Sequence, residues 1–373
     1  MSIFDQLKTG VFLDHAFNKS DSSAHKAEML FSLYEDRLND SLKYKIEALA
    51  HINYSRDFLY KDAKESLKNL LAGYVRFMKE DEKENYQNTL LIWEALQDQP
   101  KQFVDKKDSL NMPIIRDKAG LQNIQISSGK AIKNFIFDTG ANISTITEST
   151  AEEFGVKELP GSFEVDAVTG NKIQSRIGIA PQLELGSITI HNAIFLILPD
   201  EALAFPQIDY QINGILGFPV LEAMDEIQIT RDDRFIVPVN QSNSKEKNLA
   251  LDFLTPLLYL KTRNSAGVYT FDTGANKTML YNNFLQQNRQ EFNGTEPELD
   301  YTFGGAGGAI TKKGIYTTFT PEINGKIIEI DSVIVLKEPI TSKNFFFGNL
   351  GQDLINKFEK MIINFDRMFI RFE

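Results

Sequence analysis

The sequence predicts a multidomain protein in which an all-α region at the N-terminus is followed by two all-β units related by duplication. Three observations predict this fold class. Apolar residues recur at three- and four-residue steps over roughly the first hundred positions. After residue 112, short apolar runs alternate with Gly, Asn and Asp turns. One hexapeptide occurs twice in the β-like part, and a chain of 373 residues is long enough for two or three domains.

The predicted helical domain spans residues 1–112. Its apolar stripes comprise Leu30, Leu33, Tyr34, Leu38 and Leu42, continued by Ile46, Leu49 and Ala50; then Ala63, Leu67, Leu70, Leu71, Tyr74 and Phe77; then Tyr86, Leu90, Trp93 and Leu96. Pro100 ends the third stripe. Antiparallel helical hairpins of the tetratricopeptide type are an alternative description, but no convincing 34-residue period is found. We interpret the Trp93 and tyrosine stripe as helix–helix core rather than as a binding groove.

The β-like part is predicted to contain two domains, residues 113–243 and 244–373. The clearest strand-like runs of the first are 121–126, 133–137, 183–185, 188–190 and 193–197, which are rich in Ile, Leu and Phe. The polar stretch 240–247 (Asn-Gln-Ser-Asn-Ser-Lys-Glu-Lys) interrupts these runs and is predicted to be the linker between the two domains.

An internal repeat connects the two β units. The hexapeptide Phe-Asp-Thr-Gly-Ala-Asn occurs at residues 137–142 and again at 271–276, an offset of 134. The same offset relates Gly217 to Gly351, and each of these glycines lies 79 residues after its aspartate. It also relates the pairs Ser144/Thr278, Ile146/Leu280, Leu221/Ile355, Ile229/Ile363, Asp232/Asp366, Phe235/Phe369 and Ile236/Ile370. Because the register persists over a whole unit, it predicts a duplicated domain rather than a chance motif.

The repeated Asp-Thr-Gly predicts a paired carboxylate site. Each copy follows an apolar run, so its aspartate is expected at the tip of a turn, which glycine allows to be tight. Two such turns facing one another would place Asp138 and Asp272 close together. Two neighbouring carboxylates share one proton over a wide pH range. One can then act as general base on a water while the other polarises a carbonyl. A lone Asp-Thr-Gly is usually only a turn, but two copies in equivalent positions favour the catalytic interpretation.

The composition excludes several other kinds of site. The chain has no cysteine, which excludes disulfides, a thiol nucleophile and thiolate-bound metal. Its four histidines include no pair at the i, i+4 spacing of a zinc peptidase. Neither a Gly-x-Ser-x-Gly elbow nor a phosphate-binding P-loop occurs. The net charge of −11 gives no reason to expect nucleic acid as a partner. We therefore expect neither a metal nor an organic cofactor.

At these residues the chain resembles the retropepsin-like branch of the aspartic peptidases, as a fused single-chain form with two lobes. Asp-Thr-Gly-Ala in both repeats carries the resemblance, because pepsins typically have Ser or Thr in place of the alanine. A second signature, two apolar residues and glycine, occurs as Ile215-Leu216-Gly217 and, with a polar first residue, as Asn349-Leu350-Gly351. The resemblance covers roughly residues 113–373. It implies two acid-protease barrel lobes related by a pseudo-twofold axis.

The resemblance also implies roles for individual residues. Asp138 and Asp272 would be the catalytic dyad, and Thr139 and Thr273 would hold the two turns together. The remaining implied residues are Gly140 and Gly274, with amides near the carboxylates; Gly217 and Gly351, beneath the loops; and two flaps over the substrate, around Val168, Thr169 and Gly170 in the first lobe and Phe303, Gly304 and Gly305 in the second.

The leading hypothesis is an aspartic endopeptidase that cuts peptide or protein substrates and is active as a monomer, because one chain holds both aspartates. One alternative is an inactive, peptide-binding pseudo-peptidase whose helical domain mediates protein interaction. Another is that residues 1–112 inhibit or tether the site. The N-terminus is not a signal peptide as it stands and no apolar run is long enough to span a bilayer. The resemblance to exported bacterial proteins suggests a periplasmic or secreted protein whose leader has been removed.

Overall fold

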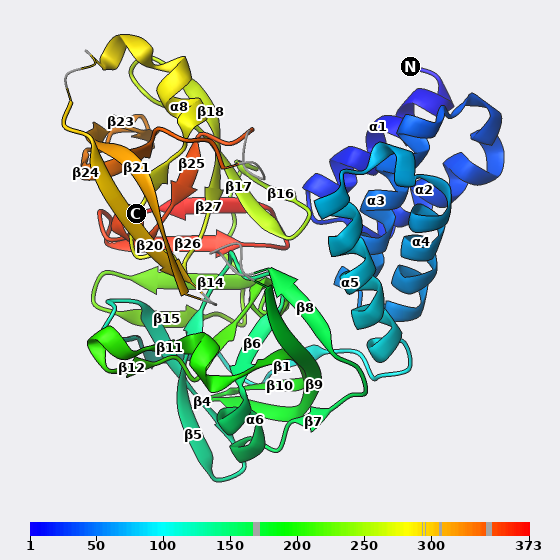
Figure 1. The fold of residues 1–373 in the computed structure, drawn as a ribbon, viewed down its shortest axis with the longest axis horizontal. Helices are drawn as coiled ribbons and strands as arrows, with labels where there is room; N and C mark the ends of the chain where they lie inside the picture. Colours follow the sequence, from blue (N-terminus) through cyan, green and yellow to red (C-terminus); the bar gives the residue numbers. More distant parts are fainter. Residues whose placement is uncertain (167–171, 293, 295, 306–307, 341–344) are drawn as a thin grey trace.

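The computed structural model describes residues 1–166, 172–292, 294, 296–305, 308–340 and 345–373. A bundle of helices at the N-terminus lies beside a larger, β-rich part (Figure 1). The helices are α1 (Ile3–Ala16), α2 (Ser20–Tyr34), α3 (Asp40–Arg56), α4 (Tyr60–Gly73) and α5 (Glu80–Leu96), with 3-10 turns η1 (Glu35–Arg37) and η2 (Val75–Phe77). Consecutive helices pack against one another. Within the described residues, no helix is both long enough and apolar enough to cross a membrane.

The helix boundaries correct the apolar stripe predicted from residue 30 to residue 50. The chain leaves the α-helix after Tyr34 and starts α3 at Asp40, where the Asn39 side chain caps the new helix by accepting the Leu42 amide at 2.9 Å. Leu38 lies in the connection but is buried against α1 and α2. Because Leu38 is apolar and buried, the apolar residues keep their three- and four-residue spacing across the connection. The spacing alone therefore does not reveal the break between α2 and α3.

The helical region contains a repeat of 40 residues, which is longer than the 34-residue period of tetratricopeptide repeats. The order helix, 3-10 turn, helix starts at residues 20, 35 and 40 and again at residues 60, 75 and 80. Leu30 and Leu70 occupy equivalent positions in the two copies, and both are fully buried. Two helical hairpins of the same length therefore stack side by side.

The β-rich part is built on two large sheets. The first contains β1 (Phe103–Lys106), β3 (Ile115–Arg116), β4 (Gln122–Ser128), β5 (Ala131–Phe137), β6 (Ser144–Thr147), β7 (Lys157–Glu158), β8 (Phe163–Asp166), β9 (Lys172–Leu185), β10 (Ile188–Leu198) and β13 (Gly214–Leu216). Around it lie α6 (Glu148–Glu153), η3 (Asp200–Leu203), the hairpin of β11 (Ala204–Phe205) and β12 (Tyr210–Gln211), η4 (Pro206–Ile208) and α7 (Phe218–Glu222). We call this part the first lobe.

The second sheet contains β16 (Leu249–Asp252), β17 (Thr255–Lys261), β18 (Ala266–Phe271), β19 (Met279–Leu280), β20 (Leu299–Gly305), β21 (Gly308–Phe319), β22 (Glu322–Ile323), β23 (Lys326–Ile327), β24 (Ile330–Leu336) and β25 (Gly348–Leu350). With α8 (Asn282–Gln287), η5 (Arg289–Glu291) and α9 (Gln352–Ile355) it forms the second lobe. Equivalent strands pair alike in the two lobes. β13 runs parallel to β5 and antiparallel to β6, and β25 runs parallel to β18 and antiparallel to β19.

A third sheet joins the two lobes. Its order is β2 (Leu110–Pro113), β15 (Arg234–Val237), β14 (Glu226–Thr230), β26 (Lys360–Asn364) and β27 (Phe369–Phe372). The central pair, β14 and β26, comes from the two lobes and lies between them (Figure 1). One apolar cluster contains buried side chains of both lobes, among them Phe137 and Phe271. The lobes therefore share a core, which holds the ends of β5 and β18 in a fixed relation.

The helical region is shorter than the predicted range of 1–112. Its last helix ends at Leu96, and β1 and β2 then pair with β10 and β15 of the β-rich part. The segment after the helices thus belongs by its hydrogen bonds to the sheets. The expected linker at 240–247 has no helix or strand and connects β15 to β16.

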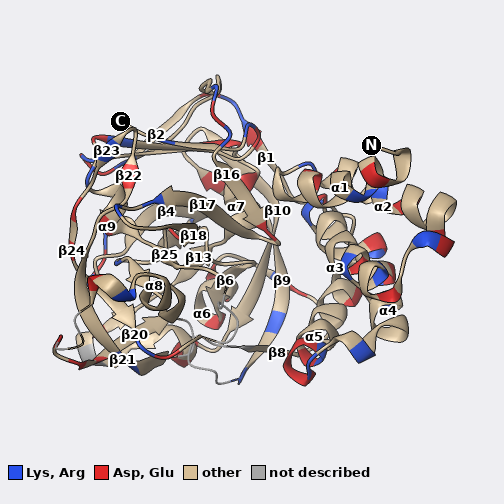
Figure 2. Cartoon of the chain, turned by 90° about the horizontal axis from the view of Figure 1, so that it is seen from above, with Lys and Arg blue, Asp and Glu red and all other residues tan. Residues whose placement is uncertain are grey.

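The helical region packs on the outer side of the first lobe. Trp93 and Leu96 of α5 share an apolar cluster with Phe163 of β8 and Ile177 of β9. Arg56 of α3 forms an ion pair of 3.2 Å with Glu222, the last residue of α7. Figure 2 shows the helices beside the strands of the first lobe, with acidic and basic residues interspersed on them.

Candidate active site

The two Asp-Thr-Gly turns lie where β5 and β18 end. The amide of Asp138 donates to the carbonyl of Leu216 at 2.9 Å, and the amide of Asp272 donates to the carbonyl of Leu350 at 3.0 Å. Each aspartate Oδ1 also accepts the amide two residues further on, from Gly140 at 2.7 Å and from Gly274 at 2.8 Å. Each carboxylate is therefore held by its own turn and by the parallel strand beside it.

Four hydrogen bonds connect the two turns. The Thr139 hydroxyl donates to the Phe271 carbonyl at 3.0 Å and accepts the Thr273 amide at 3.1 Å. The Thr273 hydroxyl donates to the Phe137 carbonyl at 2.9 Å and accepts the Thr139 amide at 3.1 Å. Both threonines are buried. Because each hydroxyl uses its donor and its acceptor across the lobe boundary, the turns are locked in one relative position.

The lock brings the two carboxylates face to face. A Cβ placed on Gly274 would lie 2.3 Å from the carboxyl carbon of Asp138, and one on Gly140 would lie 2.8 Å from that of Asp272. Neither glycine can therefore become alanine without moving the opposite carboxylate. Burial, the charge of Asp272 and a hydrogen bond with Asp272 raise the pKa of Asp138 well above its usual range. The pair is thus arranged to hold one proton between two carboxylates.

Two further glycines support the turns from beneath. A Cβ on Gly217 would lie 2.6 Å from the Ala141 carbonyl, and one on Gly351 would lie 2.7 Å from the Ala275 carbonyl. Their amides donate to the hydroxyls of Ser144 at 2.9 Å and of Thr278 at 3.1 Å. At both positions the close approach of two chain segments leaves no room for a side chain.

Asp272 also has a side-chain contact that the sequence does not predict. The side-chain amide nitrogen of Asn349 donates to Asp272 Oδ2 at 2.9 Å. The buried Thr270 hydroxyl donates to the side-chain amide oxygen of Asn349. The neighbouring Tyr281 is also buried, and burial raises its pKa to about 12. In the sequence, Asn349 differs from the signature of two apolar residues and glycine by being polar. That difference is the one sequence feature that points to this contact.

A family model described as aspartyl protease matches residues 123–220. The match includes the first turn, with Asp138, and the first supporting glycine, Gly217; it leaves the helical region and the second lobe outside. It supports an aspartyl protease family, and hence a hydrolase that acts on peptides, for this part of the chain. No curated protein matches the chain.

Of the two segments predicted to be flaps, the structure describes only the second at the predicted residues. Val168, Thr169 and Gly170 lie outside the described residues; β8 and β9, on either side of them, pair antiparallel. Phe303, Gly304 and Gly305 form the end of β20, which pairs with β21 in a long hairpin. A Cβ on Gly304 would lie 3.5 Å from the ring of Phe205 in the first lobe. The end of the second hairpin therefore reaches the opposite lobe.

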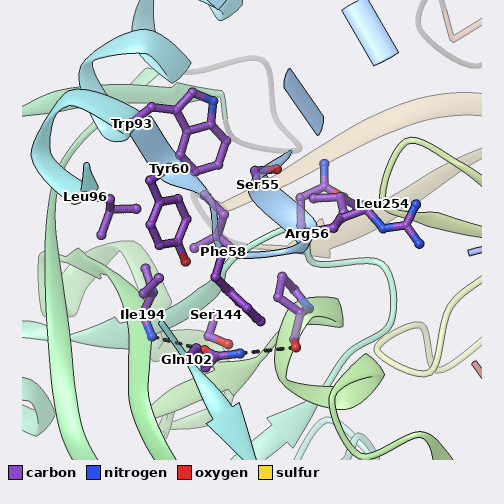
Figure 3. A pocket seen from close by; sticks show the side chains of 13 residues that line it. Ser55, Arg56, Phe58, Tyr60, Trp93, Leu96, Gln102, Ser144, Ile194 and Leu254 are labelled. Atoms are coloured by element: carbon purple, nitrogen blue, oxygen red, sulfur yellow. Dashed lines mark hydrogen bonds between the residues drawn. The ribbon is translucent and has the colours of Figure 1, made fainter. Parts of the chain in front are cut away.

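A small cavity of about 40 Å³ lies between the helical region and the two lobes, and neither Asp138 nor Asp272 lines it. Tyr60, Trp93 and Phe58 line one side (Figure 3). Gln102 lies on the other side, where it donates to the Pro219 carbonyl at 3.2 Å and accepts the Ile194 amide at 3.3 Å. A space of this size holds about one water molecule, so it belongs to the packing between domains and not to a substrate site.

Proposed function

We propose that this protein is an aspartic endopeptidase whose catalytic dyad is Asp138 and Asp272. The observation that carries the proposal is the reciprocal hydrogen bonding of Thr139 and Thr273, which fixes two carboxylates opposite one another across the lobe boundary. Such rigidity is what a general acid and a general base need to act on one water and one carbonyl.

The reaction proposed for this geometry is hydrolysis of a peptide bond by water. One carboxylate removes a proton from the water, and the other donates its proton to the carbonyl oxygen, so that a tetrahedral diol forms. The raised pKa of Asp138 supports the sharing of one proton by the pair. The pair titrates as a unit, so the activity should show one acidic and one basic limb.

The substrate is proposed to be an extended peptide bound between the two lobes. The position of Gly304 in the β20–β21 hairpin, close to Phe205 of the first lobe, supports this, because a hairpin that reaches over the lobe boundary can cover a bound chain. The two lobes are proposed to be a duplicated pair, on the support of the constant offset of 134 and the matching strand pairings. Since one chain supplies both turns, we propose that a monomer is active.

The helical region is proposed to support the first lobe from outside. It contacts β8, β9 and α7 of this lobe, and α1 also contacts β16 of the second lobe. The ion pair of Arg56 with Glu222 fixes it to the helix that follows Gly217. No described contact places a helix over Asp138 or Asp272, and nothing in the described residues favours an inhibitory role or a purely peptide-binding one.

A digest of a proteome-derived peptide library tests the proposed function. The full chain should cleave internal peptide bonds within a bounded pH range, and a pepstatin-like statine should slow the cleavage. The double variant D138N/D272N, checked for folding by circular dichroism, serves as the blank. Internal cleavage by the wild type and none by the double variant is the expected result. Equal cleavage by both would show that another site or a contaminant is responsible.

A further inference from the structure

Asn349 makes the surroundings of the two carboxylates unequal. It lies in β25, at the place where the first lobe has Ile215 in β13. Its amide nitrogen donates to Asp272 Oδ2 at 2.9 Å, while Gly274 donates to Oδ1 of the same carboxylate. Both oxygens of Asp272 therefore accept a hydrogen bond from a neutral N–H donor.

The orientation of the Asn349 amide is fixed by its partner in the adjacent strand. Thr270 lies directly beside Asn349 in the register of β18 and β25, and its hydroxyl donates to the amide oxygen of Asn349. With the oxygen engaged by a donor, the nitrogen is the end that faces Asp272. The pair thus presents N–H, and not C=O, to the carboxylate.

The first lobe has an apolar pair at the same two positions. Ile215 and Ile136 are neighbours in the register of β13 and β5, and both are buried. Asp138 accepts the backbone amides of its own turn, from Gly140 and Ala141. Among the described residues, its only side-chain partner is Asp272.

We propose, on the basis of the endopeptidase function above, that Asn349 is a positioning residue that keeps the negative charge of the dyad on Asp272. An N–H donor stabilises a carboxylate and cannot accept the proton of a carboxylic acid, so it favours the ionised form. Among the described residues, Asp138 has the backbone amides of its own turn as donors but no side-chain N–H donor, and it then carries the proton of the pair. Tyr281 also faces Asp272, and it stays neutral because burial raises its pKa to about 12.

This assignment gives each aspartate a defined role. Asp272 takes a proton from the water as the water oxygen bonds to the carbonyl carbon, and Asp138 gives its proton to the carbonyl oxygen. The C–N bond of the diol then breaks as the proton on Asp272 passes to the nitrogen. One diol hydroxyl returns its proton to Asp138. The dyad ends with the proton on Asp138 and the charge on Asp272, as it began.

The pH profile of kcat/KM for a fluorogenic peptide tests the proposal. In N349I, which copies the residue of the first lobe, the acidic limb should move up by about one pH unit, because a hydrogen bond to a charged group is lost. Activity on the acidic side should fall about tenfold, with less change near the optimum. T270V, which releases the amide without removing it, should shift the same limb less.

A swapped variant separates the donor from mere packing. In I136T/I215N/T270I/N349I the polar pair moves to the first lobe, and the acidic limb should return towards its original position because a donor again stabilises one carboxylate. An acidic limb that stays in place in N349I and T270V would overturn the proposal.

A titration by NMR, with ¹³C-labelled aspartate carboxyls, keeps this test independent of peptidase activity. In the full chain the lower pKa of the pair should belong to Asp272, identified by comparison with D272N, and N349I should raise it. If the wild type cleaves no peptide but this titration holds, the proposed function fails and the role of Asn349 stands. If the lower pKa belongs to Asp138, or N349I leaves the titration unchanged, the role of Asn349 is overturned.

Discussion

The two lobes agree in the turns that carry the aspartates and in the pairing of the strands beside them, and they differ in the side chains behind the turns. The contacts of Thr139, Gly140 and Gly217 have counterparts at Thr273, Gly274 and Gly351 with nearly equal distances. Behind the turns, the first lobe has the apolar pair Ile136 and Ile215, and the second has Thr270 and Asn349. Symmetry is therefore kept where the carboxylates must meet and is lost where each carboxylate is tuned.

A second difference lies on the outer faces. The first lobe is covered by helices that contact β8, β9 and α7, and Glu222 of α7 pairs with Arg56. The position equivalent to Glu222 in the second lobe is Asn356, whose oxygen accepts a hydrogen bond of 3.3 Å from Arg116 of the first lobe. At this corner the first lobe is thus supported by the helical region, whereas the same corner of the second lobe contacts its partner lobe.

The shared glycines give the largest expected effect. G274A should reduce kcat/KM at least about 100-fold, because the new methyl group would displace the Asp138 carboxylate from its place in the pair. G140A should do the same to Asp272. G73A, where no atom lies within 4 Å of the added methyl group, is the control and should keep full activity. If one of the two active-site variants kept full activity, the catalytic turns would not be equivalent.

The ion pair on the first lobe is expected to matter more than its counterpart on the second. E222A leaves the Arg56 charge buried without its partner, which should cost about 3 kcal/mol. Hydrogen-exchange protection in α3 should then fall by about two orders of magnitude. N356A, at the equivalent position of the second lobe, should leave α3 protection as it is. An equal loss of α3 protection in E222A and N356A would contradict the proposed difference between the outer faces of the two lobes.

The threonines should give equal effects in the two lobes. T139V and T273V each leave a buried amide and a buried carbonyl of the opposite lobe without their partner, at a cost of about 2 kcal/mol each. Both should lower the melting temperature and kcat/KM to a similar extent. T318V, at an exposed threonine, is the control for the effect of replacing threonine by valine. A large inequality would mean that the reciprocal bonds do not act as one unit.

A fall in pH should lower the stability of the helical region but not that of the two turns that carry the aspartates. Burial lowers the pKa of His51 to about 3 and that of His15 to about 4, so both are neutral in the fold. The unfolded chain takes up protons near pH 6.5, so the stability that these histidines allow is complete above that pH. It is lost progressively as the pH falls to 4 and 3, by about 1.4 kcal/mol per pH unit and histidine.

The contribution of the Asp138 carboxyl to folding stability depends on pH in the opposite direction. Its folded pKa is raised, so its contribution to stability is present below the unfolded pKa and is lost as the pH rises through the folded one. Hydrogen exchange at pH 7 and pH 5 should therefore show a loss of protection in α3 that is absent around the two turns. H51L should reduce the loss in α3, and an equal loss in both regions would contradict the assignment.

The two repeated turns could be located from the sequence because their geometry depends on the backbone. Glycine and threonine in a fixed register define the turn, so the offset of 134 was sufficient to pair Asp138 with Asp272 as candidate residues. The contact of Asn349 with Asp272 could not be predicted, because it depends on which strands become neighbours and on the Thr270 hydroxyl that orients the amide. The break between α2 and α3 was hidden because Leu38 is buried without being in an α-helix.

The central claim is that Asp138 and Asp272 form one catalytic pair within a single chain. It is tested most directly by kcat/KM of D138N, of D272N and of an equimolar mixture of the two, on one peptide at the pH optimum. Each variant should lose at least about 1,000-fold, and the mixture should be no more active than either variant alone. Full activity in one variant, or recovery of activity on mixing, would contradict the claim.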